Sequence, residues 1–410
     1  MLIRIILAAF AALLSFADAH AAEDVMIGDV PIPADASPAP RGDHVFSGVW
    51  TGTWGGQINH VFMVENIGPD GAATAIYAIG ENGSGPGRWM RTEAQIDADE
   101  IVVEGNGFTA RYRLSPTGRL RAVFGENRGF AVLKQRALSA LKTAPTLDWW
   151  SIGELAPLVT GLVEDDRPVT LNAVIYPPKG EGPFPLAIVH HGSTGDGRDP
   201  EAAKFVWAND WFADMLNARG YLVAFPQRRG RGGSDGLYDE GFALDRREGY
   251  SPEASLAIPG AERALEDAEA ALAALRRRDD IAPGPALLSG ISRGGVVALM
   301  QAGTRGEDVS GVVNFVGGWV SEGWGEASIN PTLFARGGAF GRPVLSVYGE
   351  DDTFYSIPHS RENLAALEAA GAESRLHVVS VAGRGNGHWA MAVPTLWEAE
   401  VEAYLDEVAR

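Results

Sequence analysis

A serine between glycines is the residue whose type and setting most clearly indicate chemistry. The segment Gly290-Ile291-Ser292-Arg293-Gly294 follows an apolar run at 286–288 and precedes a helical pattern at 296–300. A G-x-S-x-G segment between a strand and a helix is typical of a nucleophile elbow, a tight turn that exposes a serine hydroxyl at the end of a sheet. The glycines leave room for a strained backbone and close strand–helix packing. The pattern predicts Ser292 as a nucleophile for acyl transfer, and the alternative is a turn serine that caps the helix.

An acid that orients the catalytic base is expected after a later strand. Acyl transfer by serine needs a base, a group that orients the base, and donors for the oxyanion. The apolar run 344–348 ends in Gly349-Glu350-Asp351-Asp352. Active sites of open parallel sheets lie outside the carboxyl ends of the strands, and the acid follows the serine along the chain. We therefore predict Asp352 as the acid, with Asp351 as the second choice and a solvated acidic turn as the alternative.

The base is expected last in the chain. A glycine-rich segment, 383–388, follows the run 376–381 and ends in His388. A loop of this composition can reach back over the serine, so chain order predicts His388 as the base. His359 at a helix start and His377 within a strand are expected to be structural. His191 is the main rival base, but its place in the chain favours a supporting role.

Two backbone amides are the candidate donors for the oxyanion. One is the amide of Arg293, directly after the nucleophile, and the other comes from the loop after an earlier strand. That loop is His190-His191-Gly192-Ser193-Thr194, which follows the apolar run 186–189. We predict the amide of Ser193 as the second donor, since Gly192 lets the backbone turn inward without a Cβ clash.

Arginines and tryptophans after two other strands are candidates for shaping a pocket. Arg228 and Arg231 follow an apolar run, and guanidinium groups bind carboxylates well. We predict both as substrate-binding residues, with loop-holding salt bridges as the alternative, which we favour for Arg229. Trp319 and Trp324 are predicted to line the pocket, and burial in the core is an equal alternative.

The elements that must position these residues begin with a β-rich region. Between about 45 and 137, short alternating runs are separated by Gly, Asn and Asp turns. Such a pattern predicts an antiparallel β domain, either a small barrel or a sandwich. The segment 37–42, with two prolines, is predicted as a linker, and 138–150 as the domain junction.

From about 150 to 410 the pattern alternates between strands and helices. Continuous apolar runs are typical of parallel strands buried on both faces, so we predict a doubly wound α/β domain. The strands are expected at 170–176, 186–190, 221–225, 286–289, 311–316, 344–348 and 376–381. The helices are expected at about 201–218, 253–279, 294–304, 360–370 and 394–408.

The composition narrows the function classes and the location. The chain has 410 residues, a net charge of −19 and no cysteine, which excludes a thiol nucleophile, a cysteine metal site and disulfides. The negative charge argues against nucleic acid or an anionic membrane as partner.

The N-terminus has the pattern of an export signal. Arg4, the apolar run 5–16 and small residues at 17–22 predict a cleaved signal peptide over 1–21. A membrane anchor is the alternative, but the apolar run is shorter than a bilayer requires. We predict a protein exported to the periplasm or the outside medium, where a large core replaces disulfides.

Several motifs together resemble a known family. His191-Gly192, Arg229-Gly230-x-Gly232-x-Ser234-x-Gly236, Gly290-x-Ser292-x-Gly294, Tyr348-Gly349-x-x-Asp352 and Gly387-His388 are similar to those of α/β hydrolases of the dienelactone-hydrolase and prolyl-oligopeptidase-like branch. The resemblance covers about residues 150–410. It implies an esterase or a peptidase with Ser292, Asp352 and His388 as its triad, and no metal or organic cofactor. Dienelactone hydrolases proper use a cysteine nucleophile, which this chain lacks.

Three functional hypotheses follow. The first is an exported serine hydrolase that cleaves small carboxylic esters through an acyl-enzyme on Ser292. The second is a serine peptidase that acts on short peptides, with the β domain screening substrate size. The third is a ligand-binding protein in which the β domain holds a glycan or lipid and the hydrolase domain is vestigial. The sequence leaves the oligomeric state open.

Overall fold

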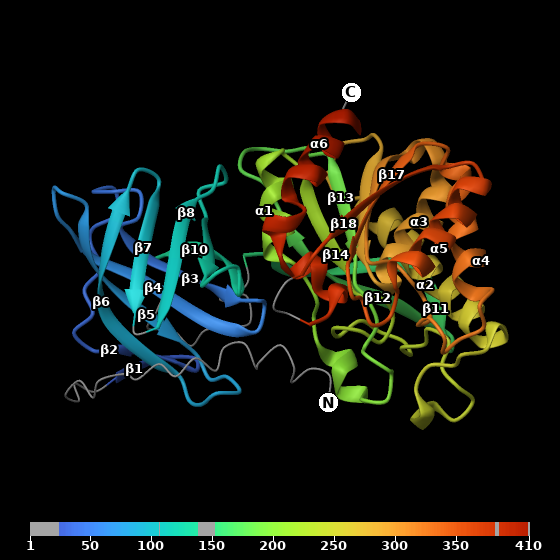
Figure 1. Ribbon diagram of the computed structural model, residues 1–410, viewed down its shortest axis with the longest axis horizontal. Helices are drawn as coiled ribbons and strands as arrows, with labels where there is room; N and C mark the ends of the chain where they lie inside the picture. Colours follow the sequence, from blue (N-terminus) through green and yellow to red (C-terminus); the bar gives the residue numbers. More distant parts are fainter. Residues whose placement is uncertain (1–23, 106, 138–151, 382–384, 409–410) are drawn as a thin grey trace. The chain divides into compact units, whose positions relative to one another are not determined.

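The computed structural model describes residues 24–105, 107–137, 152–381 and 385–408 (Figure 1). The predicted signal peptide at 1–21 and the predicted junction at 138–150 lie outside these described residues. The chain forms two compact units. One comprises the residues up to Glu154 together with Asn209–Ala218, and the other comprises Leu155–Ala208 and Arg219–Arg410.

The first unit contains a closed antiparallel barrel of eight strands in chain order, with the last strand pairing back to the first. The strands are β3 (Gly48–Trp54), β4 (Ile58–Ile67), β5 (Ala72–Ile79), β6 (Arg88–Asp97), β7 (Glu100–Gly105), β8 (Phe108–Leu114), β9 (Leu120–Phe124) and β10 (Gly129–Arg136). Eight strands enclose a space that side chains can fill. This core combines aliphatic side chains with large aromatic ones, among them Trp50, Trp54, Phe62, Tyr77 and Tyr112.

A hairpin ahead of the barrel covers part of its outer surface. β1 (Asp24–Ile27) pairs with β2 (Val30–Pro33), and Ile27, Val30 and Ile32 pack with apolar residues of β3, β4 and β5. The segment 37–42, predicted as a linker, is irregular and attached to this unit, because the Ala39 amide donates to the Val64 carbonyl at 2.8 Å.

Helix α1 (Asp210–Ala218) groups with the barrel although it lies far along the chain. Its Asp214 is fully buried and receives hydrogen bonds from Arg121 at 2.7 Å, from Arg119 and from the Thr117 hydroxyl. The predicted single helix over 201–218 is wrong. Pro200–Lys204 forms a 3₁₀ turn capped by Asp199, and Asn209 caps a separate α1 by accepting from Phe212.

The second unit contains an eight-stranded sheet in the order β11-β12-β14-β13-β15-β16-β17-β18. β12 pairs antiparallel with β14, and the pairs from β14 through β18 are parallel. The strands are β11 (Glu154–Glu164), β12 (Arg167–Tyr176), β13 (Leu186–His190), β14 (Leu222–Pro226), β15 (Ala286–Ile291), β16 (Val309–Phe315), β17 (Pro343–Gly349) and β18 (Glu373–Val379). The α/β fold class is therefore confirmed, and β11 is a strand that the sequence patterns did not indicate.

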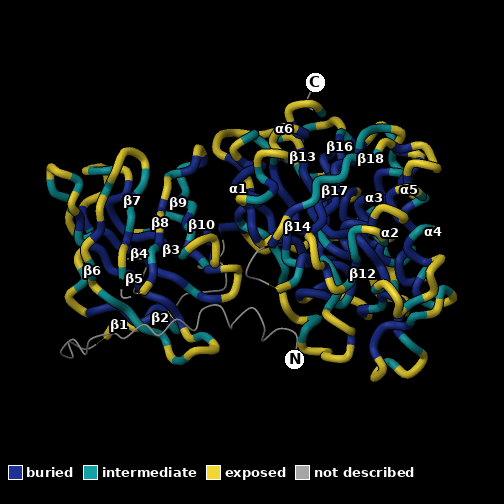
Figure 2. Tube along the Cα trace, in the orientation of Figure 1, coloured by how far each residue is buried: buried dark blue, intermediate teal, exposed yellow. Residues whose placement is uncertain are grey.

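Helices cover both faces of this sheet. α2 (Ala254–Leu275), α3 (Arg293–Arg305), α4 (Ile329–Ala335) and α5 (Ile357–Ala369) pack together on one side, and α6 (Glu398–Val408) lies against β16 on the other (Figure 1). α4 is a further element that the sequence patterns did not indicate. The central strands are buried along almost their whole length, as expected for strands covered on both faces (Figure 2). None of the helices in the described residues is both long enough and apolar enough to cross a membrane.

Candidate active site

The turn between β15 and α3 has the backbone geometry of a nucleophile elbow. Ser292 has φ 55° and ψ −124°, a conformation that costs a non-glycine residue free energy and is tolerated only where the surroundings enforce it. The Ser292 amide donates to the Phe315 carbonyl at 2.9 Å. A Cβ on Gly290 would lie 2.1 Å from the Gly294 carbonyl oxygen, and a Cβ on Gly294 would lie 2.2 Å from that of His190. Backbone contact between the strands and α3 therefore sets the place of the serine.

The predicted acid and base are hydrogen-bonded to each other. Asp352 follows β17, its side chain is fully buried, and its Oδ2 lies 2.9 Å from Nδ1 of His388. Its Oδ1 accepts from the amides of Phe354 at 2.8 Å and Tyr355 at 3.1 Å. The neighbouring Asp351 is exposed. The carboxylate is thus oriented by two backbone donors and presents one oxygen to the histidine.

The loop that carries His388 is fixed by close contact with the end of β17. The Gly387 amide donates to the Asp351 carbonyl at 3.2 Å, and a Cβ on Gly387 would lie 2.1 Å from the Glu350 carbonyl oxygen. Asn386 caps the 3₁₀ turn Gly387–Ala392 by accepting from the His388 amide. These contacts position the imidazole against Asp352.

Tyr355 is the neighbour that Ser292 and His388 share. Its ring centroid lies 5.5 Å from that of His388. Burial raises the pKa of Tyr355, while the nearby Arg293 guanidinium and the Ser292 side chain oppose that rise. Among the described residues, no hydrogen bond joins the Ser292 hydroxyl to His388, and catalytic hydrogen bonds often tighten only in the complex with substrate.

The loop after β13 lies directly beside the nucleophile. A Cβ on Gly192 would be 3.2 Å from Cβ of Ser292 and 3.2 Å from the Ile291 carbonyl oxygen, so the loop that contains Ser193 adjoins the serine. Arg293 is the first residue of α3, and amides of a first helical turn have no acceptor within the helix. The two predicted oxyanion donors therefore lie on the two segments that meet at Ser292.

Arg228 is buried in an ion pair rather than exposed to a pocket. Its Nε donates to Glu240 Oε1 at 2.5 Å, and both side chains are 2% exposed. Burial would raise the pKa of Glu240, but the Arg228 and Arg293 guanidinium groups outweigh it and hold the pKa below its ordinary value. The prediction of Arg228 as a substrate-binding residue is therefore not supported, because its guanidinium is already paired and buried.

Arg231 is also buried, and its Nη1 donates to the Gly192 carbonyl at 3.4 Å. Its guanidinium lies 5.4 Å from the centre of the Tyr238 ring. Like Arg228, it faces the protein interior, which favours the loop-holding alternative over direct substrate binding. Arg229 pairs with Asp267 and Glu266, as favoured from the sequence.

The two tryptophans that were predicted to line the pocket differ in burial. Trp319 is buried, its carbonyl accepts from Nε of Arg293 at 3.0 Å, and its ring lies under that guanidinium. Trp324 is 48% exposed. Trp319 therefore supports the Arg293 side chain, whereas about half of the Trp324 side chain is exposed to solvent.

Further residues lie around Ser292 and Arg293 that the sequence patterns did not indicate. The Tyr250 hydroxyl accepts from the Thr194 amide at 3.0 Å, and the Tyr250 ring lies 3.7 Å from the Arg293 guanidinium. Glu240 and Tyr250 reach the site from the connection between β14 and α2, and Tyr355 reaches it from the loop between β17 and α5, so no local motif marks them. Among the expected structural histidines, His359 contacts Asn330 and His377 contacts the Leu396 carbonyl.

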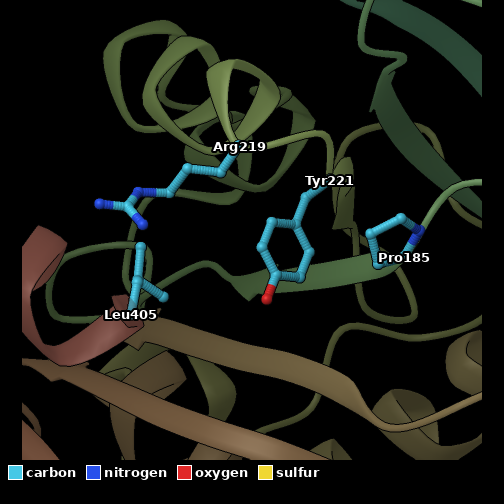
Figure 3. Close-up of a pocket in the computed structure, with 4 residues that line it drawn as sticks. All are labelled: Pro185, Arg219, Tyr221 and Leu405. Carbon is cyan, nitrogen blue, oxygen red and sulfur yellow. The ribbon is translucent and has the colours of Figure 1, made fainter. Parts of the chain in front are cut away.

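A separate pocket of about 450 Å³ is lined by Pro185, Arg219, Tyr221 and Leu405 (Figure 3). Pro185 and Tyr221 directly precede the parallel strands β13 and β14. The pocket therefore lies at the amino ends of the strands, opposite the edge that carries Ser292, and it has no part in the chemistry described above.

Comparison with known proteins gives structural similarities only. No protein-family model matches the sequence. No curated protein matches it either.

Among solved structures, Est1E from Butyrivibrio proteoclasticus is 14% identical, with 62% of this chain and 99% of that chain covered and a TM-score of 0.40. The esterase Pf2001 from Pyrococcus furiosus is 14% identical, with 62% and 90% covered and a TM-score of 0.42. A structure of prolyl endopeptidases is 15% identical, with 92% of this chain and 53% of that chain covered and a TM-score of 0.42.

The TM-scores of all three structures are below 0.5. The second unit has the arrangement of the α/β-hydrolase fold. Its strands follow the order β11-β12-β14-β13-β15-β16-β17-β18, with β12 antiparallel to β14, and a serine elbow follows the central strand β15.

Proposed function

We propose that this protein is an exported serine hydrolase that cleaves small carboxylic esters through an acyl-enzyme on Ser292. The observation that carries the proposal is the buried pairing of Asp352 Oδ2 with His388 Nδ1 at 2.9 Å, at the same sheet edge as the strained Ser292. A solvated acidic turn has no reason to bury a carboxylate against an imidazole.

The arrangement supplies each part of acyl transfer. Nε2 of His388 takes the proton of the Ser292 hydroxyl as the oxygen attacks the ester carbonyl, and Asp352 stabilises the imidazolium through Nδ1–H. The amides of Arg293 and Ser193 bind the oxyanion. The imidazolium then protonates the leaving alcohol, and water, deprotonated by His388, hydrolyses the acyl-enzyme.

Labelling with a fluorophosphonate probe, followed by peptide mapping, tests the nucleophile. We expect one adduct, on Ser292, and loss of labelling in His388→Ala because the serine then lacks its base. Ser292→Ala should reduce kcat by about 10⁴-fold or more while the fold is retained. A folded wild-type protein that takes no label, or label on a different serine, would contradict the proposal.

Paired substrates separate an esterase from a peptidase. We expect faster turnover of p-nitrophenyl acetate than of aminoacyl-p-nitroanilides. Rapid anilide cleavage with negligible ester cleavage would reverse that order and favour the peptidase.

The ligand-binding hypothesis has less support. Buried side chains of the barrel strands pack against one another in its core, and the ring centroids of Phe62 and Tyr112 are stacked 4.0 Å apart. A glycan or lipid would therefore have to bind elsewhere than in that core.

A further inference from the structure

The carbonyl oxygen of Gly192 is surrounded by three donors. Nδ1 of His191 lies 2.8 Å from it, Nη2 of Arg228 lies 3.4 Å from it, and Nη1 of Arg231 also lies 3.4 Å from it. Arg228 additionally donates through Nη1 to the His191 carbonyl at 3.0 Å. Two buried cations and one imidazole therefore converge on a single peptide group in the loop that adjoins Ser292.

The partners of His191 define its tautomer. Its Nε2 lies 3.1 Å from the backbone amide of Arg228, which can only donate. Nε2 is therefore the acceptor, and the proton lies on Nδ1, which donates to Gly192. Burial, followed by the charges of Arg228 and Arg231, holds the pKa of His191 well below its ordinary value. The ring is thus a neutral donor in this contact and is unsuited to replace His388 as the base.

A trans peptide carries its carbonyl and its amide on opposite sides. The amide in the same peptide group as the Gly192 carbonyl is that of Ser193. When donors draw electron density toward the carbonyl oxygen, the amide hydrogen becomes more positive, and bonds in such a chain strengthen one another. The direction of the Ser193 amide is fixed by the same contacts, because a planar group held at its oxygen cannot rotate freely.

The charges around this peptide also favour an anion. The carboxylate of Glu240 interacts with Arg228 at 2.5 Å and with Arg293 at 3.7 Å. Three guanidinium groups, counting Arg231, therefore share one carboxylate within this buried cluster. Among these four side chains, the cluster therefore carries a net positive charge.

We propose that Arg228, Arg231 and His191 form a clamp on the Gly192 carbonyl that aims and polarises the Ser193 amide toward the oxyanion. They are positioning residues, because they act through the peptide and not on the substrate. This inference rests on the proposed serine-hydrolase function. It also replaces the substrate-carboxylate role predicted for the two arginines with a role in catalysis that is independent of substrate charge.

The test uses Arg231, because replacing Arg228 would leave Glu240 without its closest partner. Arg231→Met keeps the length of the side chain and removes its donors, Arg231→Lys retains a charge, and Arg247→Met is a surface control on the same segment. Each variant is assayed in the full-length mature protein with p-nitrophenyl acetate and with the anionic ester p-nitrophenyl hemisuccinate. Circular dichroism verifies the fold.

We expect Arg231→Met to lower kcat about 10-fold on both esters with KM nearly unchanged, as a partial loss of one oxyanion donor would. Arg231→Lys should recover part of kcat, and Arg247→Met should match the wild type. A rise in KM confined to the anionic ester would show that Arg231 binds substrate and overturn the proposal. Unchanged kinetics in Arg231→Met would also overturn it.

A second readout does not depend on turnover. In a ¹H–¹⁵N spectrum of the full chain, a polarised Ser193 amide proton resonates downfield, and Arg231→Met should move it upfield, with no such change in Arg247→Met. A wild type that takes no fluorophosphonate label refutes the proposed function, while this shift still decides whether the clamp exists. An unmoved Ser193 resonance refutes the clamp even in an active enzyme.

Discussion

Asp352→Asn exchanges one carboxylate oxygen for an NH₂ group and keeps the shape of the side chain. In the structure, Oδ1 accepts from the amides of Phe354 and Tyr355, at 2.8 and 3.1 Å. The oxygen of an asparagine must take that place, because an NH₂ group there would face two further donors. The NH₂ group is then directed at Nδ1 of His388, 2.9 Å from the atom it replaces.

This orientation of the asparagine reverses the tautomer of His388. Nδ1 becomes an acceptor, the proton moves to Nε2, and Nε2 can no longer remove the proton of Ser292. We expect kcat to fall by about 10⁴-fold, which corresponds to about 5.5 kcal/mol of transition-state stabilisation. Because no contact with the backbone donors is lost, the fold should be retained.

Asp351→Asn is the matched control. Asp351 is adjacent, acidic and exposed, and its contact with the histidine loop is through its backbone carbonyl, which the substitution leaves in place. Steady-state hydrolysis of p-nitrophenyl acetate and the rate of fluorophosphonate labelling measure both variants near neutral pH. The reasoning is refuted if Asp352→Asn keeps more than about a tenth of the wild-type rate, or if Asp351→Asn loses as much.

Three further predictions concern the framework, each measured by urea unfolding. Gly290→Ala places a Cβ 2.1 Å from the Gly294 carbonyl oxygen and should lower the free energy of unfolding by about 3 kcal/mol. Gly161→Ala is the control, because a Cβ there meets nothing within 4 Å, and it should leave stability unchanged. Equal effects of the two substitutions would contradict the packing argument. Glu240→Gln leaves buried Arg228 and Arg293 without a counter-charge and should lower the free energy of unfolding by about 3–5 kcal/mol. Glu262→Gln, in the exposed pair with Arg336, should lower it by less than about 1 kcal/mol. Similar losses in the two variants would argue against a buried network. Burial lowers the pKa of His60 from 6.5 to about 3. Between these two pH values the imidazole is protonated in the unfolded chain and neutral in the folded barrel. The free energy of unfolding therefore falls as the pH drops from 6.5 toward 3. His60→Gln should remove about 1.4 kcal/mol per pH unit from that acid slope, and a slope unchanged by the substitution would rule out His60 as its source.

Residues marked by local pattern or chain order could be predicted from the sequence. The glycines around Ser292 must be glycines because the α3 backbone lies against β15 and β13, and this constraint is visible in the five residues Gly290–Gly294. Chain order placed the acid in the turn after β17, and the structure buries Asp352 and exposes Asp351 there.

Residues whose partners are distant in the chain could not be predicted. Arg228 and Arg231 resemble free cations in the sequence, because Glu240 and the Gly192 carbonyl come into contact with them only in the folded chain. Tyr355 carries no motif, and its place beside Ser292 depends on the loop that Asp352 holds. The helix predicted over 201–218 is interrupted because the Trp207 amide donates to Gln227, a tertiary contact that helical periodicity does not reveal.

The close backbone contacts at Gly290 and Gly294 have a practical consequence for altering specificity. Ser292 is held by main-chain atoms of the sheet and α3, so exchanging loop sequences elsewhere should leave its position unchanged. The loop of Arg228 and Arg231 is unsuited to such exchange, because it holds the peptide of Ser193. Within the part of the chain that the structure describes, no hydrogen bond links the segment around the exposed Trp324 to the Ser193 peptide, which makes it the better place to randomise when searching for variants with new substrates.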